Sequence, residues 1–211
     1  MKRSIGLVFG LLALLVGCVA SKSALTTIPE PSSLSPVVNG SHIYFVPMGD
    51  FSPGQLDSMV EFYRQRYGLE ISVLRSAPID DSVRDSARQQ LIAEKLLASL
   101  RASFPNYAND RKAILIGFTS EDLYPASQNW QFCFGWRDAT SRTAVVSTAR
   151  LNLRRDSAPF AADMSLGRLR KVVTKDLGIL YYGLPQNGNP KSVMYEFVVG
   201  IDDLDQIGEE F

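Results

Sequence analysis

Three stretches before residue 119 carry the hydrophobic pattern of β-strands. Residues 42–48 (HIYFVPM) and 111–118, with the core AILIGF, are nearly continuous apolar runs of strand length, which predicts buried strands. Residues 69–75 alternate apolar and polar positions, which predicts a strand with one exposed face.

Two amphipathic helices are predicted between these strands. Ser52 is a candidate N-cap, Pro53 fits the first helical position, and Gly68 is expected to end the helix. A second, long helix is predicted for residues 80–104, where apolar side chains recur along one side and two aspartates begin the first turn. The order strand, helix, strand, helix, strand indicates right-handed crossovers and a largely parallel sheet.

The pattern changes after residue 118. Residues 119–129 are predicted to form a loop, and residues 130–136 and 143–151 to form two strands joined by a turn. A short turn favours an antiparallel pair. One of these strands is a candidate sheet edge, to which a peptide could add by strand pairing.

A further helix is predicted in the last third of the chain. Apolar residues recur every three or four positions over residues 166–184, after a polar linker at 152–164. A loop rich in Pro, Gly and Asn at 185–190 ends the helix, and a short acidic helix is expected at 201–210.

The composition is that of one sizeable domain without a dominant charge. The 211 residues are 45% hydrophobic, enough for a single core and a small C-terminal subdomain from about residue 185. Lys and Arg number 22, Asp and Glu also number 22, and no basic run is interleaved with aromatic residues. Nucleic acid is therefore excluded as the expected partner.

The first 40 residues have the pattern of a targeting segment. Residues 1–17 combine a basic start with an apolar run too short to span a bilayer comfortably, and they end directly before Cys18. This resembles the bacterial lipobox and implies a cleaved signal peptide and a lipidated Cys18. Residues 18–40, rich in Ser, Thr and Pro, are predicted to be a tether. Because Val19 is not Asp, the enterobacterial sorting pattern favours the periplasmic face of the outer membrane.

Two residue types that often carry chemistry are assigned structural roles here. Cys133 lies among aromatic residues and is the one cysteine left after lipidation of Cys18, so we expect a buried, inert thiol. His42, the only histidine, lies in a predicted strand and is expected to be structural.

Several separated segments together resemble the archaemetzincin family of zinc metalloproteases. The most specific is AVVSTARL at 144–151, which is similar to the strand that leads to the family's active-site helix. The others are 121–124, 129–135, the helix end at 175–184, and Ser192-Val193-Met194, in which Met194 looks like the Met-turn residue beneath the metal. The resemblance implies an α/β (α+β) fold over residues 41–211, with a metzincin-like mixed, mostly parallel twisted sheet and flanking helices.

The chain departs from this family at the metal site. The zinc motif needs two imidazoles four residues apart on one helical face, with a Glu beside them. The corresponding residues here are Lys175, Asp176 and Ile179, and the third ligand falls at Pro185, or at Gln186 if one residue is inserted. These side chains cannot hold zinc as that motif does, so we expect no metal, no cofactor and no catalytic residue.

The leading hypothesis is a lipid-anchored envelope protein that keeps the family framework, lacks catalysis and binds a peptide or an envelope protein. Tyr181, Tyr182 and Tyr195 are its candidate groove residues.

Two alternatives remain open from the sequence. One is a hydrolase with a rebuilt, non-zinc site in which Asp176 acts with carboxylates such as Glu196 or Asp202. Three or more carboxyl groups converging near Asp176 would favour it. The other is a purely structural envelope lipoprotein, which a filled groove would favour.

Overall fold

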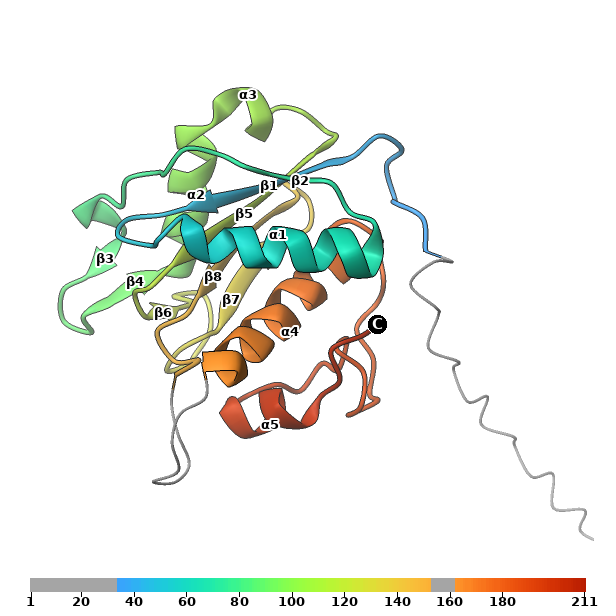
Figure 1. Cartoon of the computed structure of the whole chain (residues 1–211). Helices are drawn as coiled ribbons and strands as arrows, with labels where there is room; N and C mark the ends of the chain where they lie inside the picture. Colours follow the sequence, from blue (N-terminus) through green and yellow to red (C-terminus); the bar gives the residue numbers. More distant parts are fainter. Residues whose placement is uncertain (1–33, 153–161) are drawn as a thin grey trace, which may run out of the picture.

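A five-stranded sheet forms the centre of the structure, a computed structural model that describes residues 34–152 and 162–211. Its strand order is β2-β1-β5-β8-β7 (Figure 1). The four neighbouring strands β2, β1, β5 and β8 are parallel to one another, and β7 pairs antiparallel with β8. The strands are β1 (His42–Pro47), β2 (Ile71–Val73), β5 (Ala113–Thr119), β7 (Gly135–Asp138) and β8 (Thr143–Ser147). The predicted mixed, mostly parallel sheet and its antiparallel pair are confirmed.

Helices cover both faces of this sheet. Helices α1 (Gly54–Tyr67) and α4 (Ala162–Leu180) pack on one face, and α2 (Ala93–Ser103) packs on the other (Figure 1). Because β5 contributes Ile114 and Leu115 to opposite cores, it is buried on both sides, which explains its continuous apolar run. The remaining helices are α3 (Pro105–Ala108), α5 (Ile201–Gln206) and a 3-10 turn at Asp81–Val83.

The long helix predicted for residues 80–104 is wrong in its first half. Two short strands, β3 (Arg84–Asp85) and β4 (Gln90–Ile92), lie there instead. With β6 (Leu123–Tyr124) they form a second, three-stranded sheet in the order β3-β4-β6. The Asp85 carboxylate accepts the amides of Ala87 and Arg88, and Gln89 adopts a φ of 54°, so the chain turns back. β4 then pairs with β6, which lies inside the predicted loop, and this distant pairing overrides the helical spacing.

Two boundaries near α1 and β7 also differ from the prediction. The N-cap of α1 is Pro53 rather than Ser52, without a capping side chain, whereas Gly68 ends the helix with a φ of 64° as expected. The strand predicted at 130–136 begins only at Gly135. Residues 130 and 131 bond elsewhere, since their carbonyls accept from Arg88.

Helix α4 ends against the N-terminal part of the described chain. Gly183 adopts a φ of 66°, and this left-handed glycine ends the helix. Directly after it, Leu184 N donates to Gly178 O (2.8 Å). Val37 N donates to Tyr181 O (2.9 Å), and the Val37 side chain fills the space where Gly183 lacks a Cβ.

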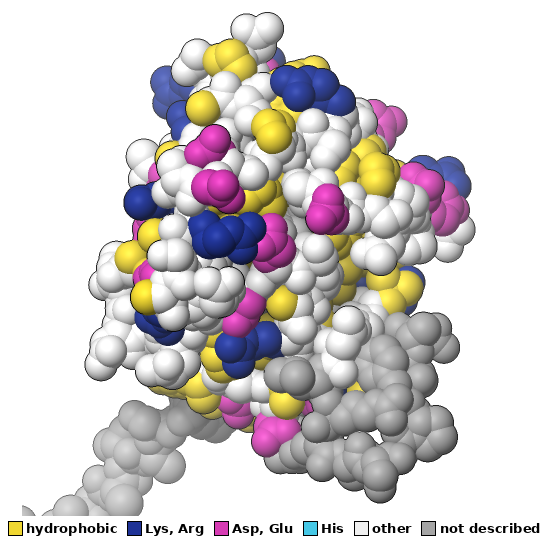
Figure 2. Space-filling model, turned by 90° about the vertical axis from the view of Figure 1, so that its left-hand side faces the viewer, with side chains coloured by type: hydrophobic (Ala, Val, Ile, Leu, Met, Phe, Trp, Pro, Cys, Tyr) yellow, Lys and Arg dark blue, Asp and Glu magenta, His cyan; other side chains and the backbone are white. Residues whose placement is uncertain are grey.

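Several sequence predictions lie outside the described residues. They are the signal peptide at 1–17, Cys18, the tether up to residue 33, and the central part of the linker, 153–161. Within the described ranges, the structure contains no helix with the length and hydrophobicity needed to span a membrane. The face seen in Figure 2 carries Lys/Arg and Asp/Glu side chains interspersed with one another, as equal numbers of each suggest.

Candidate functional site

Helix α4 lies directly against the loop that carries Met194. A Cβ at Gly178 would lie 2.6 Å from Met194 Sδ and 2.8 Å from the ring of Phe211, so this contact needs a glycine. Met194 is 2% exposed, and its carbonyl accepts the Asn187 amide (2.9 Å), which fixes the loop under the helix. The helix therefore sits over the turn that carries Met194.

Lys175 is buried on the side of α4 that faces this loop. It is 8% exposed, and its Nζ donates to the backbone carbonyl of Tyr195. Burial, and to a smaller extent the nearby Arg137, lower the pKa of Lys175 to about 8, although Asp176 and Glu196 act in the opposite direction. No carboxylate among the described residues is within hydrogen-bond distance of this ammonium group.

Asp176 is fully buried and connects α4 to the edge strand. Arg137, on β7, donates from Nε to Asp176 Oδ1, while Asp176 Oδ2 is buried without a hydrogen-bond partner in the described part of the chain. Burial raises the pKa of the Asp176 carboxyl, and Arg137 and Lys175 offset part of that rise. One charge-assisted hydrogen bond thus joins the helix to the strand.

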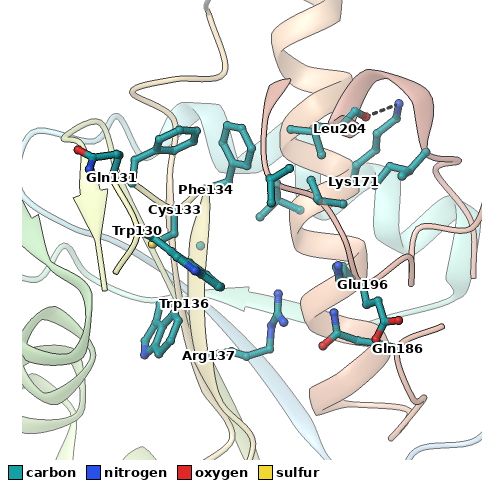
Figure 3. Close-up of a pocket in the computed structure, with 17 residues that line it drawn as sticks. Trp130, Gln131, Cys133, Phe134, Trp136, Arg137, Lys171, Gln186, Glu196 and Leu204 are labelled. Carbon is teal, nitrogen blue, oxygen red and sulfur yellow. Dashed lines mark hydrogen bonds between the residues drawn. The ribbon is translucent and has the colours of Figure 1, made fainter. Parts of the chain in front are cut away.

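A cavity of about 610 Å³ opens beside these residues, between the 130–137 segment, α4 and the chain after Met194 (Figure 3). Its apolar walls include Phe134, Trp136, Val172, Leu204 and Ile207. Four charged side chains also line it: Arg137, Lys171, Lys175 and Glu196. In Figure 3 the guanidinium of Arg137 points from the strand into the space before α4.

The three tyrosines expected in a groove are not among the residues that line this cavity. Tyr182 is 9% exposed, its ring packs against Tyr181 and Phe211, and burial raises its pKa to about 12. Tyr195 contributes its backbone carbonyl to Lys175, while its ring packs against Phe197.

Comparison with known proteins decides the family. The chain is 30% identical to the archaemetzincin of Natronomonas pharaonis over 156 residues, which are 72% of this chain and 85% of that protein. The chain belongs to the archaemetzincin family.

Solved structures of similar proteins have the same fold. The crystal structure of archaemetzincin from Methanopyrus kandleri is 26% identical with a TM-score of 0.63, covering 83% of this chain and 92% of that one. A zinc-dependent peptidase from Methanocorpusculum labreanum is 20% identical with a TM-score of 0.65, covering 80% and 95%. A scan against protein-family models found no match.

The residues of this archaemetzincin family member do not fit a zinc ion. Lys175 and Asp176 lie at positions of α4 where the family motif requires a neutral imidazole and a Glu. Arg137, on β7, reaches the same side of the helix and pairs with Asp176. Ile179 packs against the apolar core, while Pro185 and Gln186 are exposed.

The carboxylate arrangement that would favour a rebuilt hydrolase site is also not found in the described ranges. There, no group of three or more His, Cys, Asp or Glu side chains could hold a metal ion. Glu196 is exposed at the cavity, and Asp176 is already bonded to Arg137.

Sequence reasoning missed the part of the site contributed by the edge strand. Arg137 lies in the predicted turn and Gly135 near the end of the predicted strand at 130–136, and the one available signal for either residue is its position at a candidate sheet edge. Cys133 lines the cavity, but burial raises its pKa to about 12, as suits an inert thiol. His42 is exposed on β1, 6.5 Å from the ring of Tyr44.

Proposed function

We propose that this archaemetzincin family member is a lipid-anchored protein of the bacterial envelope that lacks metallopeptidase activity and binds a peptide segment of a partner in the cavity beside β7. The observation that carries the proposal is the buried Lys175 next to the Arg137–Asp176 pair. With a pKa of about 8, Lys175 is mainly protonated at pH 7. Two cations at the site repel a divalent ion, and an ammonium has no lone pair to donate to a metal.

Peptide binding is supported by the open edge of β7. Within the described chain, β7 pairs with β8 on one side only. Ser147 N donates to Phe134 O (2.9 Å) across this antiparallel pair, so Phe134 is bonded to β8. Because bonded and non-bonded positions alternate, the backbone groups of Gly135 and Arg137 point away from β8. An extended peptide can pair with them by strand addition.

Metal analysis tests the loss of the zinc site. The full-length chain, purified in detergent, would be incubated with zinc, dialysed and analysed by mass spectrometry, beside the M. labreanum peptidase as a positive control. We expect zinc well below one ion per chain. One tightly bound ion per chain, lost on Lys175→Met or Asp176→Asn substitution, would contradict the proposal.

Peptide selection tests the binding role. Random peptides displayed on phage would be selected on the full-length chain, and the enriched sequences measured against Val172→Trp, which fills the cavity. Val73→Trp, on the opposite edge strand β2, is the matched control. We expect binding to be lost in the first variant and kept in the second. No enrichment, or equal binding to both variants, speaks against this role.

The anchor at Cys18 has a separate test. Fractionation of cells that express the chain should place it in the membrane, and Cys18→Ser should release it from that fraction and abolish incorporation of labelled fatty acid. Retention of the label in the Cys18→Ser variant would rule out this anchor.

A further inference from the structure

The side chains of β7 that face α4 are those of alternate residues. A Cβ at Gly135 would lie 3.3 Å from Val172 Cγ1, and Arg137, two residues on, reaches Asp176. Both positions therefore face the helix, because side chains alternate along a strand. They are also the two residues whose backbone groups point away from β8.

The two cations at the site have unused hydrogen-bond donors. Among the described residues, the guanidinium of Arg137 makes one hydrogen bond, from Nε to Asp176, and Lys175 makes one, to the Tyr195 carbonyl. Lys171 differs, since its Nζ donates to the carbonyls of both Leu204 (3.0 Å) and Asp205 (3.2 Å). Arg137 and Lys175 thus present positive charge and free donors to the cavity.

The part of the cavity near Gly135 is apolar. Phe134, Val172 and Leu204 are buried there, and the lack of a side chain at Gly135 leaves room beside them. Trp130 and Val199, 52% and 81% exposed, also line the cavity and extend its apolar surface outwards.

We propose that this groove selects an extended peptide with an acidic side chain opposite Arg137 and a bulky apolar side chain two residues away, opposite Gly135. The inference rests on the proposed peptide-binding function and names the class of peptide. In a strand added to β7, residues opposite Gly135 and Arg137 point to the same face, with cross-strand Cβ atoms about 5 Å apart. The acidic side chain then meets both cations, and the apolar one fills the space beside Val172.

The carboxylate belongs to a side chain and not to the end of a chain. The side chain opposite Arg137 projects towards α4, as that of Arg137 does, and so reaches buried Lys175. A terminal carboxylate on the added strand stays in the plane of the sheet, away from Lys175.

The test uses synthetic peptides capped at both ends and the full-length chain in detergent, with fluorescence polarisation as the readout. The probe has the core Leu-Thr-Glu between threonines, and its comparisons carry Leu-Thr-Gln or Ala-Thr-Glu. The reversed order, Glu-Thr-Leu, covers the other strand direction. We expect the better direction of the Leu/Glu probe to bind about tenfold tighter than its Gln or Ala counterpart.

Variants assign each preference to its residue. Lys175→Met should reduce the Glu-over-Gln ratio several-fold, whereas Lys191→Met, an exposed lysine on the same C-terminal segment, should leave it unchanged. Gly135→Ala should reduce the Leu-over-Ala ratio, and Gly188→Ala, where a Cβ meets nothing within 4 Å, is its control. Because a ratio is measured, partial unfolding of a variant does not imitate the result.

Three outcomes would overturn the inference. Equal affinity for the Glu and Gln probes removes the acidic requirement but leaves peptide binding standing. Tighter binding of a Leu-Thr-Gln peptide with a free C-terminal carboxylate assigns the cations to a chain end. Failure of all probes, together with failed phage selection, removes the proposed binding function as well.

Discussion

Two aspartate–arginine pairs in this molecule differ in how completely each carboxylate is bonded. Arg150 holds Asp122 through two hydrogen bonds, at 2.8 and 2.6 Å, and Gln90 donates a third to the same carboxylate (2.8 Å). Burial alone would raise the pKa of Asp122, but these bonds outweigh it and hold the pKa below its usual value. Asp176 is more deeply buried, receives one bond from Arg137, and its pKa is raised.

The difference separates a structural clamp from the pair at which we propose that a peptide binds. The Asp122–Arg150 pair uses both carboxylate oxygens, and the guanidinium also stacks on the ring of Phe132 at 4.2 Å. The Asp176–Arg137 pair leaves one oxygen unpaired and several donors facing a cavity. A protein that needed only a connection between β7 and α4 would be served by the first arrangement; the second is suited to a ligand.

The largest expected effect comes from breaking the buried pair. Arg137→Met leaves the Asp176 charge buried without a partner, so we expect it to lower the free energy of unfolding by about 3 kcal/mol. Arg150→Met, at the more exposed pair, should cost about 1 kcal/mol. Urea unfolding of both variants at pH 7, followed by circular dichroism, measures the contrast.

A double variant checks the reason for that loss. Asp176→Asn added to Arg137→Met removes the stranded charge and should restore most of the lost stability. If the double variant is as unstable as Arg137→Met alone, packing of the arginine stem and not the buried charge is responsible.

A smaller effect tests whether the packing of α4 on the Met194 loop holds Asp176 in position independently of its bond to Arg137. Gly178→Ala places a Cβ against Met194 and Phe211 and should cost about 2 kcal/mol. Gly167→Ala in the same helix, where the nearest atom is 3.5 Å away, should instead stabilise by up to about 1 kcal/mol. Thermal unfolding of the two variants compares them; equal effects would mean that α4 does not rest tightly on the Met194 loop.

The smallest expected effect is a pH dependence from Lys175. Its pKa is about 8 in the folded chain and near 10.5 when unfolded, so between these values the unfolded chain binds more protons. The contribution of this group to stability therefore rises with pH across that window. Between pH 8.5 and 9.5, wild type should gain about 1 kcal/mol relative to Lys175→Met in urea unfolding. Parallel curves for the two proteins would show that Lys175 is not held in a low-pKa environment.

The sequence predicted the fold where burial is continuous and failed where distant pairing decides. β1 and β5 are mostly apolar because helices cover both faces, and the spacing of residues 166–180 marks α4. The helix predicted at 80–104 failed because the pairing of β4 with β6 joins residues 32 positions apart, which no local period reveals.

The candidate site was predictable to the same extent. Lys175 and Asp176 follow from the position of the helix and the resemblance. Arg137 does not, because its partner lies 39 residues away on another element and a lone arginine in a strand has no pattern. The raised pKa of Asp176 and the lowered pKa of Lys175 depend on burial that the sequence leaves undefined.

The contact of Val37 with the end of α4 determines which part of the chain a pulling force would load first. Tension applied from the N-terminal side meets the Val37–Tyr181 hydrogen bond and the side chain seated on Gly183 before it reaches β1. A pulling force would therefore strain the helix that bears Lys175 and Asp176 while the sheet is still unloaded.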